Sequence, residues 1–141
     1  MKLIQCKLTV RGMAAQIAKF VEAAKGEDGL GMPTDFALAY LVPPAVSPIP
    51  HGWRTANWGT EHELECLGTE SRRDDMDYDL EAADTPPDLA FKTFSNKYPR
   101  LHFTLAWREE GARVMGVATY QAGVENTRVF KPLPQDEEDE D

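Results

Sequence analysis

The sequence predicts an α+β fold with an antiparallel-rich sheet, two helices on one face of that sheet, and extra strands. Several short runs alternate apolar and polar residues, which is the period of a half-buried strand. Two longer segments repeat their apolar residues every three or four positions, which is the period of an amphipathic helix. The two helices are separated by strands, and strands that follow one another directly are joined by short turns. This order indicates a split βαβ sandwich of the ferredoxin-like kind.

The chain begins with a strand and a helix. Apolar residues occupy every second position of the strand: Ile4, Cys6, Leu8 and Val10. A helix over about 13–25 follows, because apolar residues then recur at helical spacing until Gly26. Its apolar stripe is formed by Met13, Ile17, Phe20, Val21 and Ala24.

The middle of the chain is less regular. Phe36–Val42 is a short apolar run that indicates a buried strand. Four prolines then exclude a regular helix or central strand over 43–52. Two of the three tryptophans follow within six residues, and we interpret 53–60 as an element containing an Asn-Trp-Gly turn. A strand over 62–69 comes next.

The second half repeats the pattern of the first. A polar hairpin loop at 71–75 leads into a strand at 76–82, whose outward positions are acidic. Thr85 is the expected N-cap of a second helix, with Pro86 in its first turn, and Pro99 ends that helix. Two further strands are expected at 101–107 and 112–121, joined by a turn at 109–111. We therefore predict one domain over 1–123 and a C-terminal arm over 124–141 that ends in a disordered acidic tail.

The charge of the chain is concentrated at its end. The net charge is −9, and residues 135–141 supply six acidic residues and no basic one. The remainder has 18 acidic residues against 15 basic ones and is close to balanced. No basic patch is evident, so direct nucleic-acid binding is not expected. No apolar run reaches the roughly 20 residues of a membrane span. We expect a cytoplasmic protein with reduced thiols at Cys6 and Cys66, since polar residues interrupt the N-terminus too early for a signal peptide.

The sequence contains no recognisable catalytic, cofactor or metal motif. Glycine-rich phosphate loops, nucleophile elbows and His-Glu-x-x-His are all missing. His62 and Cys66 are four residues apart, but in a strand this interval separates them by about 13 Å, too far to share a metal. We therefore assign no catalytic residue, cofactor or metal, and we expect the protein not to be an enzyme. Catalysis by Cys6 or Cys66 with a histidine remains an open alternative.

Three groups of residues are candidates for binding a partner. The tryptophan element either packs against the end of the sheet or forms an exposed aromatic surface, and tryptophan is frequent at binding hot spots. The acidic strand face is either solvated or a contact surface. The tail is either a solubilising end or an interaction segment that engages a basic surface. The candidate residues are Trp53, Asn57, Trp58, Asp77, Asp79, Glu81, Asp136, Glu137, Glu138, Asp139, Glu140 and Asp141.

Several blocks resemble the YubB ferredoxin-like family of phage- and plasmid-encoded proteins. The blocks are Asn57-Trp58-Gly59-Thr60 after an upstream tryptophan, Cys6–Val10, Leu41-Val42-Pro43, Thr85-Pro86-Pro87, Phe94 to Pro99, Leu101–Leu105 and Glu109-Glu110-Gly111. The resemblance covers about 4–123. The sequence departs from the family pattern after Thr60, where Glu61-His62-Glu63 replaces a Lys-Trp-Asp-like continuation. The resemblance implies a ferredoxin-like fold and a mobile-element origin but no reaction, and two cysteines cannot supply the four thiolates of an iron–sulfur cluster.

These observations favour a non-catalytic protein of a phage or plasmid that binds another protein. The expected partner is a host or element-encoded protein with a basic surface. In the concrete version, the acidic tail or the Asp77, Asp79 and Glu81 face enters a basic nucleic-acid-binding cleft of a host defence protein. The alternative is a regulatory domain that binds a small ligand or nucleotide. The protein is expected to be a monomer or a homodimer formed through its sheet.

Overall fold

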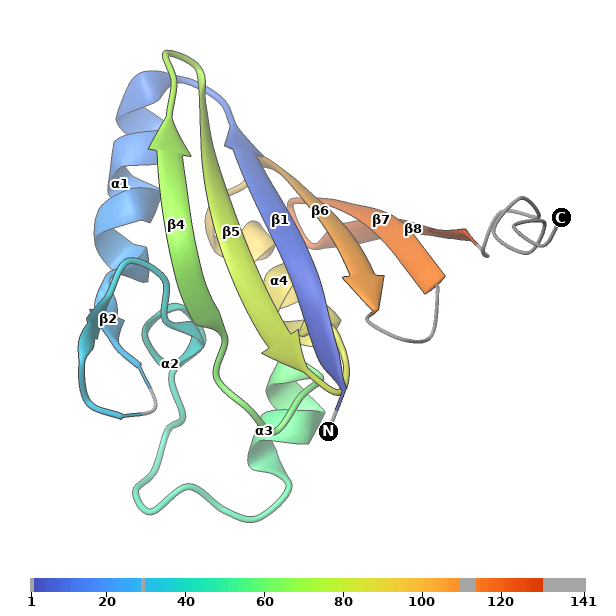
Figure 1. Ribbon diagram of the computed structural model, residues 1–141. Helices are drawn as coiled ribbons and strands as arrows, with labels where there is room; N and C mark the ends of the chain where they lie inside the picture. The colour runs from blue at the N-terminus through green and yellow to red at the C-terminus, as the bar shows by residue number, and fades with distance from the viewer. Residues whose placement is uncertain (1, 29, 110–113, 131–141) are drawn as a thin grey trace, which may run out of the picture.

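The structure is a computed structural model that describes residues 2–28, 30–109 and 114–130 (Figure 1). The side chains of 128–130 are not described. The elements in chain order are β1 (Leu3–Arg11), α1 (Ala14–Ala24), β2 (Gly26–Glu27), β3 (Pro33–Thr34), α2 (Leu38–Leu41), α3 (Trp53–Trp58), β4 (Glu65–Ser71), β5 (Asp75–Ala83), α4 (Asp88–Lys97), β6 (His102–Glu109), β7 (Val114–Gln121) and β8 (Val124–Phe130).

The main sheet has six antiparallel strands in the order β4-β5-β1-β6-β7-β8. Its first four strands, with α1 and α4, form the split βαβ unit, and β7 and β8 extend the sheet beyond β6. The register aligns the apolar positions, since Leu8 faces Tyr78 on β5 and Leu105 on β6. The predicted α+β, ferredoxin-like fold class is confirmed.

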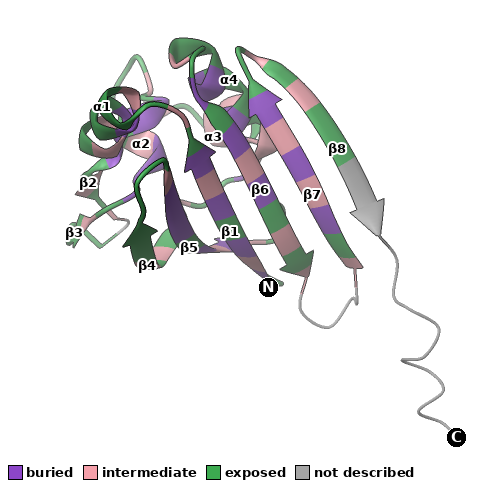
Figure 2. Cartoon of the chain, turned by 90° about the horizontal axis from the view of Figure 1, so that it is seen from above, coloured by how far each residue is buried: buried purple, intermediate pink, exposed green. Residues whose placement is uncertain are grey.

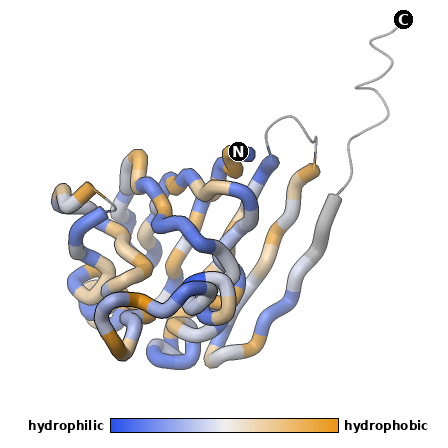
Figure 3. The backbone as a smooth tube through the Cα atoms, turned by 90° about the horizontal axis from the view of Figure 1, so that it is seen from below, coloured by the Kyte–Doolittle hydropathy of each residue, from blue (hydrophilic) through white to orange (hydrophobic). Residues whose placement is uncertain are grey.

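All four helices cover the same face of the sheet, and the opposite face is open (Figure 2). The tube in Figure 3 shows hydrophilic and hydrophobic colours alternating along the strands, as two different faces require. Six buried aromatic residues fill the space between sheet and helices, with Phe20 and Phe103 only 5.2 Å apart between ring centroids. The six are Phe20, Phe36, Tyr78, Phe91, Phe94 and Phe103. No helix in the described part of the chain is long and apolar enough to span a bilayer.

The prediction of a strand at Phe36–Val42 is wrong. The segment forms the single-turn helix α2, and the carboxylate of Glu63 accepts hydrogen bonds from the N–H groups of Leu38 (2.6 Å) and Ala39 (3.1 Å). Glu63 therefore caps the N-terminus of α2 from a distant position in the chain. A short continuous run of apolar residues has no periodicity that separates helix from strand.

The element at 53–60, expected to contain an Asn-Trp-Gly turn, is the short helix α3, whose C-cap is Gly59 in the left-handed conformation with φ of 84°. The strand expected at 62–69 begins later, at Glu65. Thr85 is not the N-cap of α4, because its hydroxyl donates to the carbonyl of Gly59 at 2.8 Å and α4 begins at Asp88. Pro99 follows the end of α4, as predicted, and 43–52 contains no helix or strand.

The C-terminal boundary of the domain also differs from the prediction. Residues 124–130, assigned to an arm, form β8 and pair with β7 from Met115↔Phe130 to Gln121↔Val124. The inward positions of this strand at Glu125 and Thr127 are polar, so the alternation that marks a strand is missing. The acidic tail, including Asp136, Glu137, Glu138, Asp139, Glu140 and Asp141, lies outside the described residues.

Candidate functional site

The tryptophan element is largely structural. Trp58 is 1% exposed, and its indole N–H donates to the carbonyl of Val42 at 2.9 Å. Trp53 is half-buried and packs edge-on against Trp58, with ring centroids 5.9 Å apart. The amide of Asn57 donates to the carbonyl of Trp53 at 2.9 Å, and the Arg54 guanidinium lies 5.6 Å from the Trp58 ring centroid. Trp58 therefore fastens the proline-rich segment to the core, and its ring cannot meet a partner.

The acidic row of β5 lies on the open face, but its carboxylates are largely occupied. Asp77 is only 5% exposed and accepts hydrogen bonds from the Thr9 hydroxyl (2.8 Å) and from Arg72. Glu81 accepts from the amide of Gln5 at 2.8 Å. Asp79 alone in the candidate triad is exposed, and it faces Lys7 across the strand pair. The expected solvated face is therefore wrong for Asp77.

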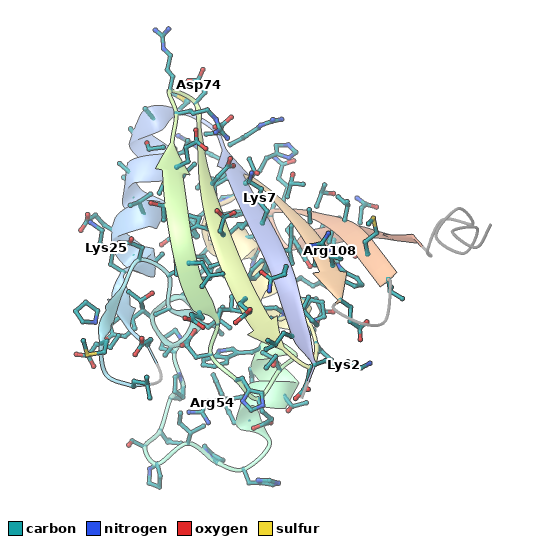
Figure 4. The ribbon with its side chains drawn as sticks, in the orientation of Figure 1. Lys2, Lys7, Lys25, Arg54, Asp74 and Arg108 are labelled. Atoms are coloured by element: carbon teal, nitrogen blue, oxygen red, sulfur yellow. The ribbon has the colours of Figure 1, made fainter. Side chains whose placement is uncertain are left out.

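Basic side chains of neighbouring strands supply the opposing charge on this face. Lys7 of β1 and Arg108 of β6 lie on the side that faces the reader in Figure 4. Lys7 approaches Asp77 to 3.9 Å, and Arg11 approaches Asp75 to 3.8 Å. Although burial opposes its charge, the hydrogen bonds from Arg72 and Thr9 hold the pKa of Asp77 below the usual value. The row is an internal ion-pair ladder rather than a free acidic surface.

A groove of about 620 Å³ lies beside the free edge of β4, between that strand and the β2–β3 hairpin. We call it the edge groove. Its walls are residues 62–68 on one side and, on the other, Asp28, Leu30, Pro33, Thr34 and Asp35. Figure 1 shows the hairpin next to the lower half of β4.

The edge groove is acidic. Asp28, Asp35, Glu63 and Glu65 line it, and none of them forms a salt bridge to another described residue. Burial raises the pKa of Glu63 in spite of its backbone hydrogen bonds, because the carboxylate is held against α2. His62 also lines the groove, and its imidazole lies 3.6 Å from the carboxylate of Asp84, which is not a lining residue.

Apolar side chains surround this acidic groove. Leu30 at the hairpin tip is 89% exposed, Met32 is 59% exposed and Leu67 is 53% exposed. Leu67 is the extra residue of a β-bulge, since Cys66 faces Leu80 and Gly68 faces Asp79. Two exposed leucines in the lining, beside carboxylates without salt bridges to described residues, are unusual on a surface that contacts only water.

A second cavity, of about 330 Å³, opens on the helix side of the sheet, under β6, β7 and β8. We call it the Trp107 pocket. Its lining consists of Gly59, Thr85, Pro86, Asp88, Trp107, Ala118, Tyr120, Glu125 and Thr127. Two blocks that carry the resemblance, Asn57–Thr60 and Thr85–Pro87, thus contribute to one cavity.

Neither cavity contains a recognisable catalytic centre. No three His, Cys, Asp or Glu side chains among the described residues are grouped to hold a metal ion. Both cysteines are free thiols, and burial raises the pKa of Cys6 to about 12. A buried thiol with that pKa is protonated at neutral pH and is a poor nucleophile.

Most of the residues that line these cavities could not be assigned to a site from the sequence. Glu63, Glu65 and Leu67 belong to a segment interpreted only as an alternating strand, and the bulge that exposes Leu67 has no signal except Gly68. Trp107 was assigned to a strand with no further role. A useful signal existed in Glu125 and Thr127, since polar residues at both alternate positions of a strand indicate an inner face without a helix cover.

The chain matches a known protein family. The family described as "Ferredoxin-like domain in Api92-like protein" matches residues 57–141, which is more than half of the sequence. The chain belongs to this family. The match begins at Asn57, so it includes β4 and every residue that lines the Trp107 pocket. The ferredoxin-like assignment made from the sequence is confirmed at this level. No curated protein and no solved structure matches the chain significantly.

Proposed function

We propose that this protein is a non-catalytic binding protein that holds an extended, positively charged segment of a partner protein in the edge groove. The observation that carries the proposal is the groove itself. It combines a free strand edge, four carboxylates without salt bridges to described residues, and exposed apolar side chains. Each of these features favours a different property of the same partner.

The free edge of β4 favours an extended partner. No strand in the described part of the chain pairs with this edge, so its outward backbone N–H and C=O groups are available for hydrogen bonds. A peptide that adds to a sheet edge gains affinity from main-chain hydrogen bonds and specificity from pockets for alternate side chains. The hairpin opposite β4 supplies a second wall that would orient such a peptide.

The charge of the groove favours a basic partner and disfavours a second copy of the chain. Asp28, Asp35 and Glu65 attract lysine and arginine side chains. In a homodimer formed edge to edge, the same carboxylates would approach one another, and like charges in contact oppose association. The expected state without a partner is therefore a monomer, although a sheet-mediated homodimer was the other expectation.

The apolar residues would supply most of the binding free energy that comes from removing apolar surface from water. Leu30 and Leu67 lie among the acidic lining residues, which resembles the division of an interface into apolar anchors and polar contacts. The free thiols of Cys6 and Cys66 suit a reducing compartment, so we place the interaction in the cytoplasm.

The resemblance to YubB proteins supports a more specific version of the proposal. A phage or plasmid accessory protein of this kind would bind a host or element-encoded protein, for example a defence protein with a basic nucleic-acid-binding surface. The edge groove would then meet that surface, with residues 136–141 as an additional acidic contact. The β5 row contributes less, because Asp77 is buried and bonded within the chain.

The proposal is tested with labelled peptides in solution. One nine-residue peptide alternates lysine with valine, and a second has glutamate in place of each lysine. We expect the lysine peptide to bind the protein, measured by fluorescence anisotropy, and the glutamate peptide not to bind. Hydrogen exchange should slow at the amides of β4 that do not bond to β5, which identifies strand addition.

Matched variants locate the binding surface. We expect Asp35→Lys with Glu65→Lys to abolish binding of the lysine peptide, whereas Glu70→Lys, on the same strand but outside the groove lining, keeps it. Equal binding by both variants, or unchanged exchange along β4 in the bound state, would show that the edge groove is not the site.

A further inference from the structure

The Trp107 pocket is a small open cavity on the helix side of the sheet, opposite the open face. Its volume of about 330 Å³ lies at the lower end of the roughly 300–1,000 Å³ typical of ligand pockets. A cavity of this size holds one side chain or a small molecule rather than a nucleotide. It is separate from the edge groove, because the two share no lining residue.

The aromatic wall of the pocket depends on a glycine. Gly116 of β7 faces Trp107 of β6 in the register, and a β-carbon at position 116 would overlap the indole ring. Glycine in a strand interior is destabilising relative to alanine. Its use here allows the indole to lie directly against the backbone of β7. Ala118 and Tyr120 continue the wall along β7, and Tyr120 is fixed by edge-on packing against Phe91 at 5.8 Å.

Two carboxylates complete the lining and make the pocket negative. Asp88 comes from the first turn of α4 and Glu125 from β8, and neither forms a salt bridge to another described residue. Burial and the nearby charge of Glu125 both raise the pKa of Asp88, while Lys92 lowers it. Lys92 lies on α4 and does not line the pocket, so the lining itself contains no cationic group.

An indole face beside two carboxylates is the chemistry that recognises an organic cation. A guanidinium or alkylammonium group is attracted by the aromatic face and forms charge-assisted hydrogen bonds to carboxylates. We propose that the Trp107 pocket binds one guanidinium or alkylammonium group, with its alkyl chain against Trp107 and its charge between Asp88 and Glu125. Anions, including nucleotides, are excluded by the same charges.

The test uses n-butylguanidinium and, as the neutral isostere, n-butylurea. Each is titrated into the ¹⁵N-labelled protein, and the three indole N–H signals are followed by NMR. We expect butylguanidinium to shift the Trp107 signal, assigned with Trp107→Phe, and to leave Trp58 unchanged, because Trp58 is bonded to Val42 away from the pocket. Equal shifts from both compounds, or none at millimolar concentration, would overturn the proposal.

Charge variants provide the second arm. Glu125→Gln should weaken butylguanidinium binding about tenfold, because it removes one charged hydrogen-bond partner. Asp79→Asn makes the same charge change on the open face and should leave the affinity unchanged. Equal affinity in all three proteins would contradict the proposed site. The peptide test of the edge groove is unaffected by these variants, so the two proposals fail independently.

The same titration distinguishes two sources of the cation. A blocked peptide, acetyl-Gly-Arg-Gly-amide, represents a side chain of a partner protein, and 1,4-diaminobutane represents a free amine. Tighter binding of the peptide than of the diamine would assign the pocket to a protein side chain. Tighter binding of the diamine would assign it to a small molecule, and failure of both would contradict recognition of the shared chemistry.

Discussion

The carboxylates of β5 and those of the edge groove, which flank the neighbouring strand β4, differ in what surrounds them. On β5, cross-strand partners on β1 and the Arg72 side chain hold Asp77 and Asp75 in hydrogen bonds and ion pairs. In the edge groove, Asp28, Asp35 and Glu65 have no ion-pair partner among the described residues. Paired carboxylates stabilise the fold, whereas unpaired ones in a hollow remain available to a ligand. Acidic composition alone does not distinguish the two.

The largest expected effect is on stability. Asp77→Ala should lower the free energy of unfolding by about 2–3 kcal/mol, because it removes hydrogen bonds from Thr9 and Arg72 to a buried charge. Asp79→Ala, two residues away and exposed, should change it by less than about 0.5 kcal/mol. Urea denaturation of the three proteins measures both values. If both variants lost the same free energy of unfolding, the hydrogen bonds and ion pairs of Asp77 would not explain its contribution to stability.

Acid should remove the contribution of Asp77 to the free energy of unfolding. Its pKa is lowered in the folded protein, so the stabilisation is present above the unfolded pKa of about 3.9 and is lost as the pH falls through the lower folded value. The difference in unfolding free energy between the wild type and Asp77→Asn should therefore be constant from pH 7 to about pH 4.5 and shrink below it. Urea titrations across this range provide the measurement, and a difference that grows on acidification would reverse the assignment.

The edge groove should respond to salt where the β5 row does not. Binding of the lysine peptide should weaken by about tenfold as the ionic strength rises from low values to about 0.5 M, because exposed charges are screened. Asp35→Asn with Glu65→Gln should bind more weakly and lose most of this salt dependence. Anisotropy titrations at each salt concentration measure the affinity. If the affinity of the variant depended on salt as strongly as that of the wild type, Asp35 and Glu65 would not contribute to binding.

The smallest effect concerns the Trp107 pocket. Affinity for butylguanidinium should fall by roughly twofold to threefold as the pH is lowered toward the raised pKa of Asp88, because protonation removes one of two attractive charges. The decline should begin above the ordinary carboxyl range near 3.9. NMR titrations at several pH values measure it. Asp88→Asn should bind more weakly and show a flatter profile, and an identical profile would assign the titration to another group.

Alternation and helical spacing identified the elements that have one solvent-exposed face and one buried face. β1, β5, β6, α1 and α4 have this property, and their residues made the ferredoxin-like fold predictable. The elements that were missed do not have it. α2 has only four residues, too few to show a helical period, and its N-terminus is capped by Glu63, which lies 25 residues from Leu38. β8 is polar at its inward positions because they line the Trp107 pocket.

The candidate site was harder to predict from the sequence than the fold, for the same physical reason. Trp53, Asn57 and Trp58 were identified by residue type, but their role depends on Val42, which the sequence does not connect to them. Asp77 and Asp79 occupy equivalent positions in an alternating pattern. Only the cross-strand register, which places Thr9 opposite Asp77, distinguishes a buried carboxylate from an exposed one.

The proline-rich segment at 43–52 is anchored at the two residues that precede it, and Trp58, which follows the segment, supplies one of these anchors. The Lys97 ammonium donates to the carbonyl of Leu41 at 2.8 Å, and the Trp58 indole donates to Val42. Within the segment most residues are exposed, and none lines either cavity. Loops with fixed ends accept inserted residues at a small entropic cost. Residues 44–47 are therefore a suitable position for an epitope or fluorophore tag, which would report on the protein without covering either cavity.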